Sequence, residues 1–290
     1  MSGAINHIKN EILAETAERV VDILGPGLDE IKVERAVFGL FFSGVKLSDG
    51  SGGLAFTPVK EIPQAVCCPS SAQAMPLSGR LLERPIRRYL EDLGSANILN
   101  KTLALSVLNA LSFSAWQARP PRDYEMVQGK DAFDEAVIPP EGKTVVIGAL
   151  VPMLRRLLKL GADFKVLEQD PATLKPAELA HYLPADRAAE VVPQAKLLVI
   201  TGVTILNDTL PDILKMAQPG AEIIVTGPTA SMLPEAFFER GVTTLGGIMV
   251  TKPDELLDII SQAGSGYHFF GKSAERLIIR KKPGRSARAA

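Results

Sequence analysis

Two apolar runs, each followed by a Thr-Gly pair, constrain the fold of this chain most strongly. They span Leu197–Ile200 and Ile223–Val225. Continuous apolar runs rich in β-branched residues, separated by an amphipathic segment of about a dozen residues, are typical of parallel strands buried on both faces with a crossover helix between them. We therefore expect a parallel sheet in which these two strands are neighbours.

The second half of the chain extends this pattern. Further strands are expected at 144–148, 164–168, 242–250 and 276–279, with helices at 152–160 and 253–263. Regular alternation of strands with short helices indicates an α/β fold. We predict a Rossmann-like, doubly wound and mostly parallel sheet with at least five strands, four of them parallel.

A smaller α+β unit is expected before this sheet. The pattern predicts a helix at 5–24 ended by Gly25, an antiparallel meander from residue 31 with a turn at Asp49-Gly50, and a helical stretch at 80–94. The predicted organisation is an α+β domain over 1–94, a Rossmann-like domain with a leading interdomain helix over 95–283, and a disordered tail over 284–290.

The leading helix, expected at 97–114, carries a stripe of small polar residues on one face. The stripe contains Thr102, Ser106, Asn109 and Ser112. A buried Asn109 without a partner would cost about 1 to 3 kcal/mol. Either Asn109 bonds the backbone of the second domain, or it faces a ligand.

Bulk properties exclude several classes of protein. A formal net charge of -1 gives no global attraction to nucleic acid or to an anionic membrane, and no apolar run reaches the length of a membrane span. The sequence therefore predicts a cytoplasmic protein with no nucleic-acid or membrane partner. Cys67 and Cys68 are adjacent, which disfavours a disulfide between them, so we expect reduced thiols.

The residues that follow the predicted strands form the candidate site. Parallel sheets bind ligands beyond the carboxyl ends of their strands. Small polar and glycine residues there can donate hydrogen bonds without filling the space that a ligand needs. The candidate ligand-binding residues are Asn109, Gly148, Glu168, Thr201, Gly202, Thr204, Asn207, Thr209, Gly227, Pro228 and Thr229.

Glu168 lies twenty residues after Gly148, the spacing at which dinucleotide-binding folds place an acidic residue on a ribose hydroxyl. The glycines that would let the backbone approach a pyrophosphate are absent from the segment after Gly148, which disfavours ordinary NAD binding. Glu168 is either a ribose ligand or a solvated carboxylate at a strand end.

The loops after the two Thr-Gly pairs also have structural explanations. Asn207 or Asp208 is placed to cap a helix through Met216, with Pro211 in its first turn. Gly227-Pro228 could simply form a tight turn. The same chemistry at two neighbouring strand ends nevertheless favours a shared pocket. No HxH, HExxH or CxxC pattern predicts a preassembled metal site.

Several motifs resemble one known family. VLExDP from residue 166, TGVTILNDTL from 201, TGPTASMLPEAFFERGV from 226 and LNALS from 108 resemble the putative heavy-metal-chelation family. The resemblance implies an enolase N-terminal-like domain followed by a Rossmann-like domain, with a site for a metal chelate or small molecule in the cleft between them. The positions shared with that family are Asn109, Gly148, Glu168, Thr201, Gly202, Thr204, Asn207, Thr209, Gly227 and Pro228.

Three functional interpretations stay open. The leading one is a protein that binds or processes a metal chelate or a small anionic metabolite in the interdomain cleft, with any metal ion carried by the chelating ligand. The alternative is a nucleotide- or S-adenosylmethionine-dependent enzyme. In the third, the cleft is vestigial and the protein serves as an assembly partner. The sequence does not determine the catalytic residues, the cofactor or the oligomeric state. A homo-oligomer is one of the states that it allows.

Overall fold

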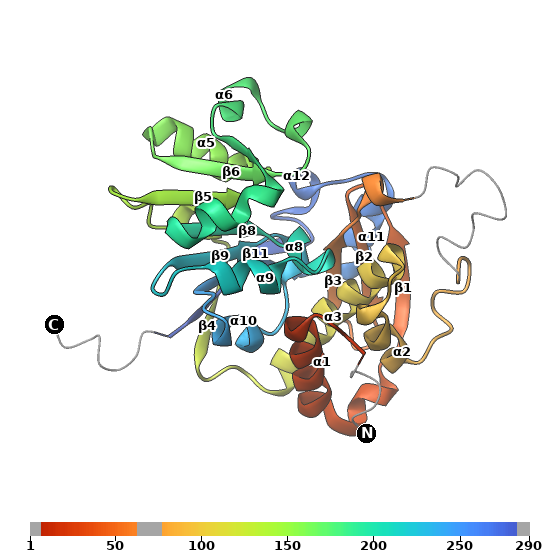
Figure 1. Ribbon diagram of the computed structural model, residues 1–290. Coiled ribbons are helices and arrows are strands. Elements are labelled where there is room, and N and C mark those ends of the chain that lie inside the picture. The colour runs from red at the N-terminus through yellow and green to blue at the C-terminus, as the bar shows by residue number, and fades with distance from the viewer. Residues whose placement is uncertain (1–6, 63–76, 283–290) are drawn as a thin grey trace.

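A computed structural model describes residues 7–62 and 77–282. The chain forms two sheets that lie side by side, and the long helix α3 runs beside the smaller one (Figure 1). The predictions of reduced thiols at Cys67 and Cys68 and of a disordered tail at 284–290 lie outside the described residues.

The smaller sheet is the predicted antiparallel meander. Its strands are β1 (Val33–Phe38), β2 (Phe42–Leu47) and β3 (Gly52–Phe56), paired in that order. The predicted turn between β2 and β3 is confirmed, with Gly50 at φ +86°. A positive φ is readily accessible only to glycine, which explains the Asp-Gly pair at this position.

The larger sheet has eight strands in the order β4-β11-β10-β9-β8-β5-β6-β7. They are β4 (Tyr124–Gln128), β5 (Lys143–Ile147), β6 (Phe164–Glu168), β7 (Tyr182–Pro184), β8 (Ala195–Thr201), β9 (Glu222–Thr226), β10 (Thr244–Val250) and β11 (Ala274–Lys281). The strands from β10 through β7 pair in parallel, whereas β11 pairs antiparallel with both neighbours. The α/β, doubly wound and mostly parallel fold is therefore confirmed; β4 and β7 were not predicted.

The helices connect and cover these sheets. They are α1 (Glu11–Leu24), α2 (Ile86–Glu91), α3 (Ile98–Ala118), α4 (Ala132–Glu135), α5 (Val151–Leu160), α6 (Pro176–Leu179), α7 (Ala188–Val191), α8 (Val203–Leu206), α9 (Leu210–Met216), α10 (Glu235–Glu239), α11 (Pro253–Ser261) and α12 (Gly266–Phe269). Two predicted helix starts are wrong. Asn10 caps α1 by accepting from the Leu13 amide at 3.3 Å, and α2 begins only after Pro85.

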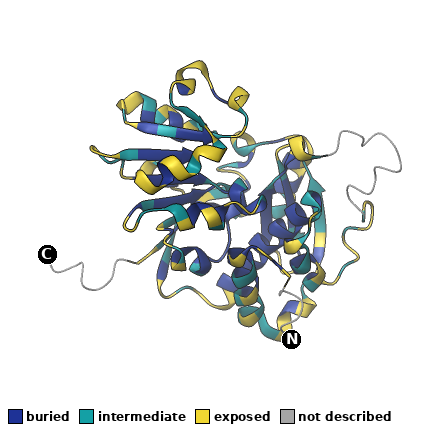
Figure 2. Ribbon diagram, viewed as in Figure 1, coloured by how far each residue is buried: buried dark blue, intermediate teal, exposed yellow. Residues whose placement is uncertain are grey.

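Helix α3 is the buried centre of the fold (Figure 2). It is long and apolar enough to cross a membrane by composition alone, but 83% of its apolar window is buried inside the protein, as in a core helix. Its polar stripe faces both halves of the chain. The Ser106 hydroxyl donates to the Ser43 carbonyl at 3.0 Å, and the Ser112 hydroxyl accepts from the Leu233 amide at 3.2 Å.

Helix α11 follows β10 in the sequence but packs on the smaller sheet. A Cβ at Gly44 would lie 3.0 Å from Leu257 and 3.1 Å from Ile260, so this glycine lets the helix approach β2 closely. Leu54 shares a buried cluster with the apolar face of α11. Arg35 adds ion pairs with Asp254 and Asp258 on the helix at 2.8 and 2.7 Å. The smaller sheet thus packs against both α3 and α11.

Ion pairs join N-terminal segments of the chain to C-terminal ones, and they predict that the folded state loses stability in acid. Glu15 accepts two bonds from Arg240, at 2.6 and 2.8 Å, and these bonds lower the pKa of Glu15 from its ordinary 4.5. Lys46 and then Arg35 lower the pKa of Asp254 from 3.8. Because both carboxyls titrate lower in the folded state, their stabilisation is complete above the unfolded pKa and is lost as pH falls through the folded one.

We therefore expect the thermal unfolding midpoint to fall as the pH drops below about 4.5, and to depend little on these groups nearer neutrality. Thermal scans from neutral pH to about pH 3 measure this. Over this pH range the unfolding midpoint of the double variant Glu15→Gln, Asp254→Asn should fall by fewer degrees than that of the parent. Parallel curves for the two proteins would contradict the assignment.

Candidate functional site

The carboxyl ends of β5, β8 and β9 meet in one continuous patch of backbone. A Cβ on Gly148 would lie 2.7 Å from the Thr201 methyl carbon, so the loop after β5 touches the end of β8. A Cβ on Gly227 would lie 3.7 Å from the Gly202 amide nitrogen. A Cβ on Gly202 would lie 3.4 Å from the Thr229 side chain. We call this arrangement the strand-end crevice. It brings together these predicted residues from three separate loops.

Glu168, at the end of β6, binds the loop beside it. One carboxylate oxygen accepts from the Ala149 amide at 2.9 Å, and the other accepts from the amides of Gln169 and Asp170 at 2.7 and 3.2 Å. Neither alternative from the sequence, a ribose ligand or a freely solvated carboxylate, anticipated these bonds. One of these amides, that of Ala149, lies two residues before α5, in the loop where dinucleotide-binding folds hold a phosphate. Backbone amides at this strand end therefore hold an anion supplied by the chain itself.

Asn109 joins the two sheets. Its side-chain amide donates to the Leu54 carbonyl at 2.7 Å and to the Pro228 and Thr229 carbonyls at 3.2 Å each. Of the two roles considered for Asn109, the geometry shows the bonds to the backbone of the second sheet. Thr229 strengthens the same junction, because its hydroxyl accepts from the Phe56 amide at 3.0 Å. Both side chains are buried.

Thr204, Asn207 and Thr209 lie along and after α8. The buried Thr204 hydroxyl donates to the Thr201 carbonyl at 2.7 Å, and Asn207 accepts from the Thr209 hydroxyl at 2.7 Å. The predicted side-chain cap of α9 is wrong: the N-cap is Thr209, which makes no side-chain capping bond. Asn207 instead closes its own turn. Pro211 does lie in the first turn of α9.

Asp208 explains why that turn is not a cap. It adopts φ +61°, which directs its carboxylate away from α9 and toward α1 and α3. One oxygen accepts from the Asn10 amide at 2.9 Å, and the other bonds the Lys101 ammonium at 2.5 Å. The Lys101 side chain is only 4% exposed. This pair was missed, although a lysine inside an otherwise apolar helix signals the need for a buried anionic partner.

A second missed pair joins the segment after β3 to the loop after β6. Lys60, in a short helical turn after β3, bonds Asp170 at 2.5 Å. This contact, with the Ala172 amide as a smaller contributor, holds the pKa of Asp170 below its usual range. The pair links the smaller sheet to the loop after β6. Both side chains are well exposed, so the link itself adds little stability.

The described residues do not form a resident metal site. Within 7–62 and 77–282, no group of three or more His, Cys, Asp or Glu side chains is placed to hold a metal ion. Glu168 therefore offers at most an isolated carboxylate next to the strand-end crevice.

Two cavities, of about 890 and 560 Å³, are lined by none of the predicted site residues. The larger one lies between α1, the end of α3, the start of β4 and α10. The strand-end crevice is thus defined by contacts between loops, and these cavities are separate features of the molecule.

Comparison with known families matches two segments of the chain. Residues 131–279 match the model of a family described as "Putative heavy-metal chelation", and residues 21–112 match a second model with the same description. Together these segments contain the whole smaller sheet, α3 as far as Ser112 and most of the larger sheet.

Related proteins support the same grouping over nearly the full length. An uncharacterized protein of Methanocaldococcus jannaschii is 26% identical over 268 residues, covering 90% of this chain and 95% of the relative. A DUF364-family protein of unknown function from Pyrococcus horikoshii superposes with a TM-score of 0.70 at 21% identity, covering 93% of this chain and 99% of that one. Another, from Desulfitobacterium hafniense, gives 0.69 at 20% identity, covering 92% and 99%. At these identities the two structures establish the shared fold alone.

Proposed function

The chain belongs to the family described as "Putative heavy-metal chelation", and from that premise we propose that it binds a metal ion already held by a small chelating ligand, in the strand-end crevice. The supporting observation is Glu168. Its carboxylate is fixed by three backbone amides beside the crevice. A fixed anion favours a bound cation electrostatically and disfavours a bare anion.

The lack of a resident metal site favours a chelate over a free ion. A transition metal in a protein usually takes four or more ligands. Because the described residues supply no such cluster, we infer that the chelator supplies most of the coordination. The amides of Gly148, Gly202 and Gly227 are already bonded to carbonyls of neighbouring strands, so the chelator's own oxygen atoms would bond hydroxyl groups at the strand ends, such as that of Thr201. Bare anionic metabolites are the second candidate, because the same hydroxyl donors suit oxygen-rich groups, but the fixed Glu168 carboxylate makes this candidate weaker than a chelate.

The nucleotide alternative has less support. A dinucleotide pyrophosphate needs free amides at the start of the helix after the first strand. In this chain the Ala149 amide is already bonded to Glu168 at 2.9 Å. Glu168 would have to release this loop before the loop could bind a phosphate.

Matched probes can test the proposal by isothermal titration calorimetry. Zinc citrate, zinc chloride and sodium citrate separate chelate, free metal and free anion; NAD and S-adenosylmethionine test the nucleotide alternative. We expect zinc citrate to bind more tightly than either component. Glu168→Gln should weaken that binding by about tenfold, which corresponds to about 1.4 kcal/mol, the scale of one charged contact.

A matched control keeps this result specific. Glu190→Gln removes an exposed carboxylate on α7 that pairs with Arg187, outside the crevice, and should leave zinc citrate binding unchanged. Equal affinity of the parent and Glu168→Gln proteins for zinc citrate would contradict the proposal. Binding of citrate alone with the same affinity would favour the anionic metabolite, and binding only of a nucleotide would favour the enzyme interpretation.

A further inference from the structure

The larger cavity, of about 890 Å³, is lined by no residue of the strand-end crevice. Tyr124, in its wall, begins β4. Strand β4 is antiparallel to β11, which is antiparallel to β10, so β4 runs in the same direction as the parallel strands. The Tyr124 wall of the cavity therefore lies at the amino end of a strand, whereas the strand-end crevice lies at carboxyl ends.

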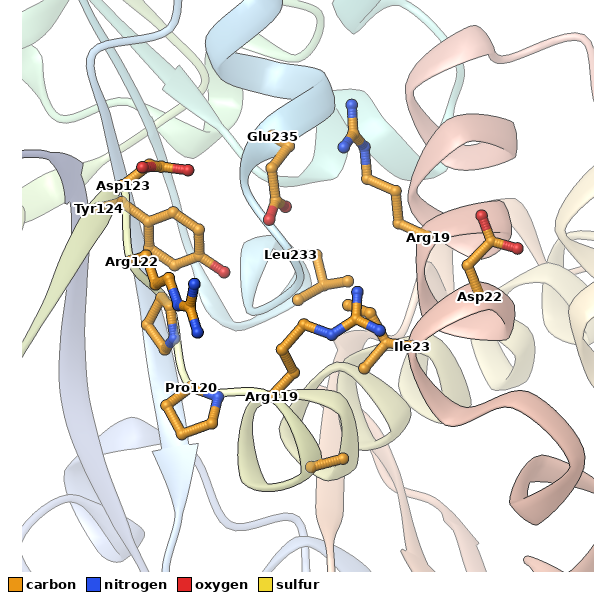
Figure 3. A pocket seen from close by; sticks show the side chains of 12 residues that line it. Arg19, Asp22, Ile23, Arg119, Pro120, Arg122, Asp123, Tyr124, Leu233 and Glu235 are labelled. Carbon is orange, nitrogen blue, oxygen red and sulfur yellow. The ribbon is translucent and has the colours of Figure 1, made fainter.

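The wall of the cavity holds a carboxylate, that of Glu235, with one buried oxygen that has no hydrogen-bond partner among the described residues. Glu235 points its carboxylate between Tyr124 and Arg19 (Figure 3). The buried oxygen is its Oε2 atom. A buried acceptor left without a donor costs about 1 to 3 kcal/mol. A ligand that brings a charged N–H donor to the Glu235 carboxylate would offset that cost.

Tyr124 makes the same end of the cavity suitable for a cation. Its buried phenol oxygen accepts from the Trp116 ring N–H at 2.7 Å. Burial, with the nearby Glu235 carboxylate as the next cause, raises the pKa of Tyr124, so the phenol stays protonated. The Tyr124 hydroxyl also contributes a hydrogen bond to the Glu235 carboxylate. A neutral hydroxyl does not cancel the negative charge of that carboxylate.

The rim has the opposite preference. Arg119 and Arg122 are exposed and, within the part of the chain that the structure describes, make no ion pair. Arg19, by contrast, is bonded to Glu239 at 2.5 Å. Guanidinium groups bind carboxylates through two parallel hydrogen bonds, a geometry that lysine cannot provide. Two unpaired arginines at one mouth therefore suit a carboxylate ligand.

The whole lining carries no net charge. Its three arginines are balanced by Asp22, Asp123 and Glu235. A bare anion would meet these carboxylates, and a bare cation would meet the arginines. A ligand with separate positive and negative ends can satisfy both the Glu235 carboxylate and the rim.

We propose that this cavity is a second binding site, for a zwitterionic amino acid whose ammonium group bonds Glu235 and whose carboxylate bonds Arg119 and Arg122. The volume lies within the roughly 300 to 1,000 Å³ of small-molecule pockets. The site shares no residue with the strand-end crevice. Either site can therefore be present without the other.

Calorimetric titration of the full chain with three amino acids tests the proposal. The probes are L-glutamate, L-lysine and L-phenylalanine, each compared with a counterpart that lacks one charged group: glutarate, cadaverine and 3-phenylpropanoate. We expect at least one amino acid to bind and its counterpart to bind about tenfold more weakly or not at all. Glu235→Gln should lower the affinity for that amino acid by about tenfold. The double variant Arg119→Gln, Arg122→Gln should lower it by a similar factor.

Arg155→Gln, which changes an exposed arginine on α5 outside the cavity, is the matched control and should bind normally. The rim arginines are exposed, so their variant should fold even if Glu235→Gln does not. The proposal is overturned if none of the three amino acids binds, if glutarate binds as well as L-glutamate, or if the rim variant keeps the parent affinity. Glu168→Gln should leave amino acid binding intact, which separates this site from the proposed chelate site.

Discussion

Asp208→Asn is expected to lower the free energy of unfolding by about 2 to 3 kcal/mol. The change removes the carboxylate that bonds Lys101, whose side chain is 4% exposed, and leaves that ammonium group buried without a counter-charge. Breaking a fully buried pair costs about 3 to 5 kcal/mol, but the Asp208 side chain is 49% exposed, so part of the attraction is already screened. Asparagine tolerates the left-handed backbone of residue 208 and keeps an acceptor for Asn10.

A second substitution separates loss of charge balance from loss of packing. Lys101→Met removes the buried charge and keeps most of the side-chain volume, so Asp208→Asn combined with Lys101→Met should recover much of the lost stability. Denaturant unfolding of the parent, the single variants and the double variant completes the cycle. A change within about 0.5 kcal/mol for Asp208→Asn alone, the size of an ordinary surface effect, would show that the pair contributes nothing.

Asn109→Asp is expected to have the larger effect, at least about 3 kcal/mol. The replacement turns the amide that donates to three carbonyls into a group with no N–H, at a position that is 1% exposed. A carboxylate facing three carbonyl oxygens must either stay charged without a donor or bind a proton. Both outcomes weaken the junction between β3 and the turn after β9.

The control for this experiment lies on the same helix. Asn100→Asp makes the same chemical change in the first turn of α3, where an acidic side chain is favoured by the helix dipole. Thermal and denaturant unfolding should therefore find Asn109→Asp strongly destabilised and Asn100→Asp nearly unchanged. Similar stabilities for the two variants would mean that Asn109 does not hold the sheets together.

Much of the fold could be predicted because its signals are local. The apolar runs that became β5, β6, β8 and β9 each carry their own pattern, and the Asp-Gly turn of the meander needs no distant partner. Strands β4 and β7 were missed for a related reason. One follows a Pro-Pro pair and has little alternation, and the other spans only Tyr182–Pro184. Their strand character depends on an edge provided by β11 and β6.

The sequence predicted which residues lie at the site but not which of them bond to one another. Sequence patterns located the glycines and threonines at the strand ends, because the carboxyl ends of parallel strands share one edge. Which donors bond which acceptors depends on contacts between remote segments, such as Lys60 with Asp170 and Asn10 with Asp208. The Asn207 cap failed for this reason, since Asp208 turns toward α3 and not toward the helix that follows it.

The position of α11 bears on the order in which a ribosome makes this protein. The face of β2 that includes Gly44 stays uncovered until Pro253–Ser261 has been synthesised, because those residues form the helix that packs there. Chains emerge N-terminal end first, at about 5 to 20 residues per second. The first sheet thus waits through more than 200 residues of synthesis, from the end of β2 to the start of α11, with an apolar surface exposed. Folding of the early half is completed only when nearly the whole chain has left the ribosome.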